Sequence, residues 1–282
     1  MSANETDLTK AETHFAFGKN WAEFSEKVTE AEIGEAERDL QRLIEEEEIV
    51  GKSFLDIGCG SGLHALAALR LGAKHVLALD IDTDSAATAR AMLERHTSEQ
   101  NQQKAWQVEE KSVFDLLPEK EGRFDVVYSW GVLHHTGDLA RALDSAAACV
   151  APGGLFCFAL YRRVLLDWFW RLEKRWYAKA TPEAQARARR YFVAWHRLLT
   201  GRKEHERYVA DYRDNRGMNY YHDVHDWMGG WPYESISPKE VERHMRTLGF
   251  DLVRKFVSRG RLGRYTGLLG SGCDEYVYRR QR

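Results

Sequence analysis

A glycine-rich turn joins a short apolar run directly to a helical pattern, and this junction constrains the fold more than any other feature. The apolar run covers residues 53–57, the turn reads Asp-Ile-Gly-Cys-Gly-Ser-Gly over 56–62, and the helical pattern of 63–71 ends at Gly72. Glycines allow a tight turn and a close approach of the backbone to a ligand, while a helix N-terminus offers free N–H donors. The junction therefore predicts a strand, a ligand-binding loop and a helix.

Strand and helix patterns alternate along most of the remaining chain. A helix is expected over 25–49, and further strands are expected at 75–79, 106–109, 124–129, 155–160, 250–257 and 275–278. Strands separated by helices of about ten residues indicate βαβ units and a parallel sheet. We therefore expect an α/β fold with a Rossmann-like, mostly parallel seven-stranded sheet, an antiparallel last strand, an N-terminal helix and an inserted, mainly helical cap.

The cap is predicted where the alternation breaks down. Residues 161–235 hold six of the nine tryptophans and eight of the twelve tyrosines, and an insertion of this length is too long for a plain loop. The predicted organisation has four segments: an N-terminal helical and lid segment at 1–49, a cofactor-binding core at 50–160, the cap at 161–235, and a C-terminal helix and strands at 236–282 that complete the core.

Two acidic residues near the turn indicate which cofactor it binds. Asp80 ends the second predicted strand, where a carboxylate accepts hydrogen bonds from the ribose hydroxyls of an adenosine. Residues 60–65 also fit the GxGxxA pattern of dinucleotide sites, so a nicotinamide coenzyme is an alternative. Asp56, inside the turn, would repel a pyrophosphate and suits the ammonium group of a methionine moiety. The residues favour S-adenosylmethionine.

In combination these motifs resemble the class I S-adenosylmethionine-dependent methyltransferases, over 50–160 and again over 237–280. Residues 54–62 are similar to the family's first motif, Asp80 to the acidic residue of its second, and 124–135 to its fourth. The cofactor-binding residues that the turn and the resemblance imply are Asp56, Gly58, Gly60, Gly62, Asp80, Ile81, Val113, Phe114, Ser129 and Trp130.

The resemblance extends to a bacterial subgroup with an aromatic N-terminal entry segment and a cap. Residues 15–21, 225–234 and 272–276 are similar to its signatures. It implies that Phe17, Asn20 and Trp21 form a lid over the cofactor, with simple packing of this segment as the alternative. The resemblance fixes no substrate.

Four residues are candidates for a general base that takes a proton from the methyl acceptor. His134 and His135 follow the fourth predicted strand, at the edge of the sheet where ligands bind in open α/β folds. His225 and Asp226 lie among aromatic residues of the cap. Histidines that cap or pack within a helix are the alternative. No metal site is expected, because a histidine pair with nearby acids still needs a third ligand at defined geometry.

Aromatic residues of the cap are candidates for the acceptor pocket. The predicted substrate-binding residues are Tyr220, Tyr221, Trp227, Trp231 and Tyr233. Aromatic clusters also form hydrophobic cores, and packing is the alternative for this one.

Charge is distributed unevenly, although the net charge is only −2. Residues 1–50 hold 14 acidic and 5 basic side chains, whereas 161–216 hold 15 basic and 7 acidic ones. The basic stretch is either a solvated helical face or a surface that attracts an anionic acceptor or nucleic acid. The polar N-terminus and the lack of a bilayer-length apolar run predict a cytoplasmic protein without a membrane partner.

The expected function is methyl transfer from S-adenosylmethionine to an O, N or S atom of a small-molecule acceptor, with an anionic acceptor as one option. Three alternatives remain. A tRNA methyltransferase is favoured by Arg254, Lys255 and the basic cap. A nicotinamide-dependent oxidoreductase is favoured by the GxGxxA pattern. A non-catalytic cofactor-binding subunit would be favoured if replacing all four candidate bases by alanine left the activity unchanged. The sequence indicates no oligomeric state.

Overall fold

The computed structural model describes residues 21, 25, 28–97, 105–212, 220–257 and 266–282. The chain forms two compact units. The sheet unit comprises the described residues of 21–163, 234–257 and 272–282. The cap unit comprises the described residues of 164–233 and 266–271.

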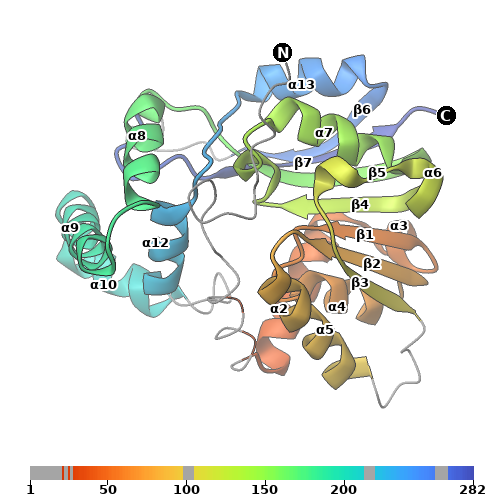
Figure 1. The fold of residues 1–282 in the computed structure, drawn as a ribbon, viewed down its shortest axis with the longest axis horizontal. Coiled ribbons are helices and arrows are strands. Elements are labelled where there is room, and N and C mark those ends of the chain that lie inside the picture. The colour runs from red at the N-terminus through yellow and green to blue at the C-terminus, as the bar shows by residue number, and fades with distance from the viewer. Residues whose placement is uncertain (1–20, 22–24, 26–27, 98–104, 213–219, 258–265) are drawn as a thin grey trace. The chain divides into compact units, whose positions relative to one another are not determined.

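The sheet unit contains a seven-stranded mixed sheet with helices between its strands (Figure 1). The strands are β1 (Ser53–Ile57), β2 (His75–Asp80), β3 (Trp106–Glu110), β4 (Phe124–Trp130), β5 (Val150–Tyr161), β6 (Phe250–Phe256) and β7 (Cys273–Arg280). The helices are α2 (Glu30–Leu43), α3 (Glu46–Ile49), α4 (Leu63–Arg70), α5 (Thr83–Thr97), α6 (Pro118–Glu121), α7 (Leu139–Ala148) and α13 (Pro238–Thr247), with short 3-10 helices at Val113–Asp115 and Leu133–His135.

The strand order is β3-β2-β1-β4-β5-β7-β6. β1 to β5 pair in parallel, while β7 runs antiparallel to both of its neighbours, β5 and β6. The predicted fold class, with its antiparallel last strand, is therefore confirmed. The chain moves outward from β1 to β3 and then returns to β4 on the other side of β1. Ligands of open α/β sheets bind at such a reversal, outside the carboxyl ends of the strands.

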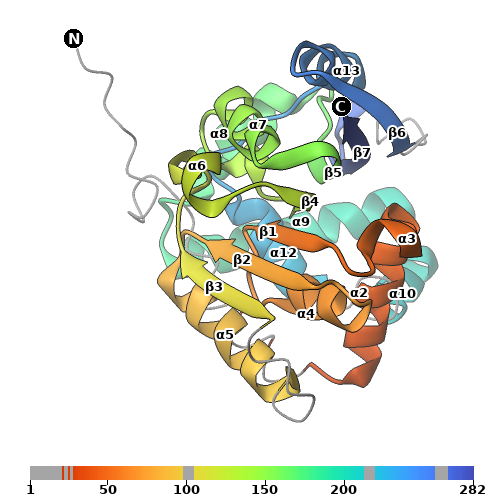
Figure 2. The same ribbon diagram turned by 90° about the vertical axis from the view of Figure 1, so that its right-hand side faces the viewer.

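The sheet is covered on both faces because its strands are apolar on both sides. Phe54 of β1 and Val76 of β2 face α2, α4 and α5, whereas the next residue of each strand faces the side of α7 and α13. Figures 1 and 2 show these two helical layers on opposite sides of the sheet. The glycine turn after β1 is thus held between two packed layers.

Helix starts follow local sequence signals. Thr29 caps α2 and Glu32 returns a bond to its backbone, which completes a capping box. Ser237 and Glu240 form the same arrangement at the start of α13, with Pro238 in the first turn.

The structure differs from the sequence-based expectation at two elements. The single helix expected over 25–49 is divided, because the backbone at Ile44 is extended between α2 and α3. β5 begins at Val150, five residues before the expected start, since the turn at 152–154 is accommodated inside the strand. The register with β4 shifts there, between Phe124 and Val126.

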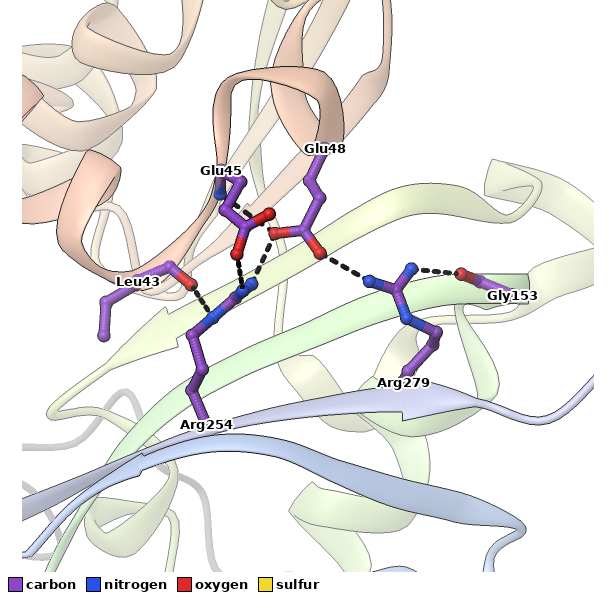
Figure 3. Close-up of polar contacts among 6 residues, drawn as sticks. All are labelled: Leu43, Glu45, Glu48, Gly153, Arg254 and Arg279. Carbon is purple, nitrogen blue, oxygen red and sulfur yellow. Dashed lines mark hydrogen bonds and ion pairs between the residues drawn. The ribbon is translucent and has the colours of Figure 1, made fainter.

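Glu48 joins the N-terminal helices to the last two strands (Figure 3). Its carboxylate pairs with Arg254 of β6 and with Arg279 of β7. Arg254 also contacts Glu45, at 2.8 Å, and donates a hydrogen bond to the carbonyl of Leu43 at 2.9 Å. Arg254 had supported nucleic-acid binding in the sequence, but its charge is engaged within the fold.

The cap unit is mainly helical. Its described helices are α8 (Asp167–Tyr177), α9 (Pro182–Thr200), α10 (Arg202–Ala210) and α12 (Tyr220–Gly229). The core of the unit contains Tyr177, Tyr212, Tyr220, Val224 and Met228. No helix within the described ranges of the whole chain combines the length and the apolar character needed to cross a bilayer.

Candidate functional site

The glycine turn lies between β1 and α4 and is tied to the neighbouring strand β2. Gly58 and Cys59 both donate backbone hydrogen bonds to the carbonyl of Leu79, at 2.7 and 2.9 Å. The N–H of Gly60 donates to Asp80 Oδ2 at 3.0 Å. Gly58, Gly60 and Gly62 have φ values of 73°, 54° and 78°, in the left-handed region that favours glycine. The turn and the acidic end of β2 therefore form one structure.

Each of these glycines also allows another part of the sheet unit to come close. A Cβ on Gly58 would lie 2.5 Å from the Val132 side chain, and a Cβ on Gly62 would lie 2.9 Å from Cβ of Ala89 in α5. A Cβ on Gly60 would lie 2.9 Å from an indole carbon of Trp21. From the sequence, these positions were expected to be glycine so that a ligand could approach the backbone. The structure shows a second reason, which is that neighbouring side chains pack closely against them.

Asp56 is a buried carboxylate at the end of β1, where the turn begins. Its Oδ2 atom has no hydrogen-bond partner among the described residues. Burial, and then the charge of Asp80, raise the pKa of Asp56 to about 7, against a smaller opposing effect of the Ala65 N–H. A buried carboxylate oxygen without a donor is costly, so this atom suits a ligand that brings a donor or a positive charge.

Asp80 completes the acidic pair at the end of β2. Its two oxygens accept hydrogen bonds from Gly60 and, at 2.9 Å, from the N–H of Asp82. Burial raises the pKa of Asp80 to about 6, although these N–H groups and that of Ile81 oppose the rise. Two carboxylates beside one glycine turn disfavour a pyrophosphate and favour hydroxyl or ammonium donors.

The loop after β3 lies beside the end of β2, because the N–H of Lys111 donates to the carbonyl of Asp80 at 2.8 Å. It continues into the 3-10 helix that contains Val113 and Phe114, which Ser112 caps. Val113 is buried, and Phe114 is half-buried with the Arg141 guanidinium 4.4 Å from its ring centroid. The structure thus brings these two predicted residues close to Asp80 and the half-buried Ile81.

Ser129 and Trp130, at the end of β4, use their polar atoms within the sheet unit. The buried Ser129 hydroxyl donates to the carbonyl of Ile57 at 3.0 Å, linking β4 to β1. Trp130 Nε1 donates to Glu275 of β7, also at 3.0 Å. Their contact with the cofactor stays a prediction.

The predicted lid falls largely outside the described residues. Phe17 and Asn20 lie outside them. Trp21 is described, half-buried, and its indole lies against Gly60 of the turn.

His134 and His135 are buried in the short helix after β4. The N–H of Tyr161 donates to His134 Nδ1 at 3.3 Å, so this nitrogen is an acceptor. The ring centroid of His134 lies 3.8 Å from that of Tyr161 and 4.3 Å from that of His135. These are contacts of packed histidines, and a role as general base stays a prediction for both.

His225 and Asp226 lie on α12 and belong to the cap unit, whereas His134 belongs to the sheet unit. His225 Nδ1 is 2.7 Å from Tyr177 Oη and 2.9 Å from Arg189 Nη1. Because a guanidinium only donates, Nδ1 accepts from Arg189. The described residues contain no group of three or more His, Cys, Asp or Glu side chains arranged to hold a metal ion.

The aromatic residues predicted to bind substrate have different environments within the cap unit. Tyr220 is buried in its core, Tyr221 is exposed and Trp231 is half-buried. Trp227 lies under the ammonium of the buried Lys174, which is 3.4 Å from the ring centroid. The buried Tyr233 donates to Asp167 at 3.0 Å. Contact with substrate stays a prediction for all five residues.

A cavity of about 690 Å³ in the cap unit involves residues that the sequence analysis did not single out. It is lined mainly by aromatic side chains of α8 and α9, among them Trp168, Phe169, Trp176, Tyr191, Phe192 and Trp195. The pair Tyr191 and Trp195 has the i, i+4 spacing that places two side chains on one helical face. This spacing, in a strongly basic helix, is the sequence feature from which an aromatic face on α9 could have been predicted.

Comparison with known proteins agrees with this geometry. A family model described as a methyltransferase domain matches residues 28–255. The chain is 36% identical over 116 residues to a ubiquinone biosynthesis O-methyltransferase of Xanthomonas euvesicatoria pv. vesicatoria, covering 41% of this chain and 46% of that protein. The chain thus spans about half the length of this curated relative.

Solved structures share the fold. Magnesium protoporphyrin IX methyltransferase from Synechocystis PCC 6803, with bound SAM, matches with a TM-score of 0.51 at 12% identity, over 89% of this chain and 80% of that one. An S-adenosylmethionine-dependent methyltransferase from Mesorhizobium loti matches with a TM-score of 0.51 at 19% identity, over 86% and 96%. The resemblance to class I enzymes is confirmed, while the finer subgroup stays a prediction. Because the family model covers most of the chain, the protein belongs to the methyltransferase domain family.

Proposed function

We propose that the protein transfers a methyl group from S-adenosylmethionine to an oxygen, nitrogen or sulfur atom of a small-molecule acceptor. The observation that carries this proposal is the acidic pair at the glycine turn. Asp56 presents a buried oxygen that lacks a donor within the described part of the chain, and Asp80 is fixed to the turn by Gly60. This set of donors and acceptors fits a ligand with an ammonium group and ribose hydroxyls.

The residues in and around the turn have distinct tasks in binding this cofactor. Asp80 would accept hydrogen bonds from the ribose hydroxyls, and Asp56 would balance the ammonium charge, directly or through water. Val113 and Phe114 would provide apolar contacts for the adenine, and Trp21 would cover the turn at Gly60. When bound, the cofactor supplies an electrophilic methyl group on a sulfonium. The protein contributes position and a fixed electrostatic environment.

The nature of the acceptor is supported by the relatives. The curated relative is named for O-methylation in ubiquinone biosynthesis, which is chemistry on a small molecule. The relatives do not favour tRNA modification or nicotinamide chemistry. Within the sheet unit, Arg254 and Lys255 are paired with Glu45, Glu48 and Glu242, so they contribute little free charge to a nucleic-acid surface.

Radiolabel transfer tests the proposal. The purified protein is incubated with S-adenosylmethionine labelled at the methyl group and with either the small-molecule fraction of a bacterial cell extract or purified tRNA. We expect label in a small-molecule product, and less of it with Asp80→Ala when S-adenosylmethionine is kept below saturation. Label in tRNA, or transfer that is unchanged by Asp80→Ala, would contradict the proposal.

A further inference from the structure

The cavity between α8 and α9 has the size and the walls of a small-molecule site. Its volume of about 690 Å³ lies within the range of about 300–1,000 Å³ that is common for ligand pockets. The residues that line it belong to the cap unit alone, with Met228 of α12 and Leu268 completing the aromatic walls of α8 and α9.

These walls leave much aromatic surface uncovered. Trp168 is 63% exposed and Tyr191 76% exposed, and Phe169, Trp176 and Trp195 are also exposed. Single exposed aromatic residues are common, but a continuous apolar surface of this kind marks a binding site.

One acidic residue belongs to this apolar wall. Glu173 lines the cavity, and both of its carboxyl oxygens are buried without a hydrogen-bond partner in the described part of the protein. Burial raises the pKa of Glu173 to about 7, although Lys174 opposes the rise. An acceptor in this position destabilises the protein until a donor reaches it.

The neighbouring lysine does not provide that donor. Lys174 Nζ lies 3.8 Å from Glu173 Oε2, beyond hydrogen-bond distance. It donates instead to the carbonyl of Trp227, and its charge lies over the ring of the same residue, 3.4 Å from the centroid. Arg187 also lines the cavity, but it is exposed, so solvent screens its charge.

We propose that this cavity binds a largely apolar, ring-containing small molecule through a hydroxyl or amino group that donates a hydrogen bond to Glu173. The aromatic walls take the rings, and the unsatisfied carboxyl group selects the donor. The inference deepens the proposed function and rests on it in one respect, which is that the bound molecule is the methyl acceptor. The residues that form the pocket all belong to the cap unit.

A matched pair of probes tests the role of Glu173. 2-Naphthol and 2-methoxynaphthalene share an aromatic body, and only the former carries a donor. Ligand-observed NMR titration of the full chain at about pH 8.5, where Glu173 is ionised, should show 2-naphthol binding about tenfold or more tightly than its methyl ether, the effect of a hydrogen bond to a charged group. Glu173→Met should bring the two affinities together, whereas Glu183→Met, at an exposed position of α9, should preserve the difference.

Further measurements separate the possible failures. Tyr191→Ala should weaken both probes by about five- to tenfold through lost ring contacts. Equal affinities in the unaltered protein, or a preference for naphthol that survives Glu173→Met, would overturn the inference. Calorimetry with S-adenosylhomocysteine on the same samples reports on the glycine turn independently. If S-adenosylhomocysteine binds but the protein shows no preference for naphthol, only the proposed pocket is refuted. If S-adenosylhomocysteine does not bind, the proposed function is refuted.

Discussion

The backbone N–H of Gly60 donates a hydrogen bond to Asp80 Oδ2 over 3.0 Å. This bond joins the centre of the glycine turn to the end of the adjacent strand, so the two parts of the proposed cofactor site are positioned together. Asp80 Oδ1 is held as well, by the N–H of Asp82. The carboxylate is thus oriented before any ligand arrives, which reduces the entropy lost on binding.

Asp80→Ala should weaken the binding of S-adenosylhomocysteine by about 1–3 kcal/mol, because charge-assisted hydrogen bonds to the ribose are lost. Asp84→Ala is the matched control, since Asp84 is an exposed carboxylate at the start of α5. Isothermal titration calorimetry measures both. Equal dissociation constants for Asp80→Ala and the control would remove Asp80 from the site.

Cofactor binding should release about half a proton per site at about pH 7, because the pKa of Asp56 is raised to about 7 in the free protein. A nearby ammonium favours the charged carboxylate and lowers that pKa, so the protonated fraction loses its proton. At about pH 8.5 the release from Asp56 should fall nearly to zero, since this carboxyl is already ionised.

Calorimetry in buffers of different ionisation enthalpy measures this release. Asp56→Asn should abolish it, and Asp84→Asn should leave it unchanged. Proton uptake, or a release that persists in Asp56→Asn, would show that another group titrates.

Gly60→Ala and Trp21→Ala should be energetically coupled. The added Cβ would lie 2.9 Å from the Trp21 indole and would force a φ of 54° on alanine. We expect Gly60→Ala to destabilise the protein by about 1–3 kcal/mol. The destabilisation should be smaller by at least about 0.5 kcal/mol in a Trp21→Ala background, because the contact is absent there. A double-mutant cycle from urea denaturation that gives strictly additive effects would exclude this contact.

Glu48→Ala should lower the free energy of unfolding by about 1–3 kcal/mol, because Arg254 and Arg279 both lose their carboxylate partner. The Glu48 side chain is only 14% exposed, so solvent screens these pairs less than it screens surface pairs. Glu47→Ala, on the exposed side of α3, should change stability little. Guanidinium chloride would screen the ion pairs, so urea denaturation is the appropriate measurement. Similar effects of the two substitutions would show that the cluster in Figure 3 contributes little.

Local and short-range features of this protein could be predicted from its sequence. The alternation of apolar runs and helical patterns indicated the strands of the sheet. The residues of the capping box at the start of α13, Ser237 and Glu240, are likewise neighbours in the sequence. The turn at Gly58–Gly62 and the carboxylate of Asp80 lie at the ends of consecutive strands, so their proximity follows from the parallel sheet alone.

Features that depend on distant contacts could not be predicted. Glu48 lies in an acidic run that is typical of a solvated helix end, and its pairing with Arg279 requires the folded sheet. The close approach of Ala89 to Gly62 depends on how α5 packs against α4. The aromatic cavity and its unsatisfied Glu173 likewise depend on how α8 and α9 are arranged with α12 in the cap unit, which the sequence does not specify.

The choice of cofactor is the central claim, and equilibrium titration of the purified protein tests it most directly. S-Adenosylhomocysteine and NAD⁺ are titrated separately into the same sample by calorimetry. The acidic pair of Asp56 and Asp80 predicts binding of S-adenosylhomocysteine at about micromolar concentration, near −8 kcal/mol, and no measurable binding of NAD⁺. Binding of NAD⁺ without affinity for S-adenosylhomocysteine would contradict the account.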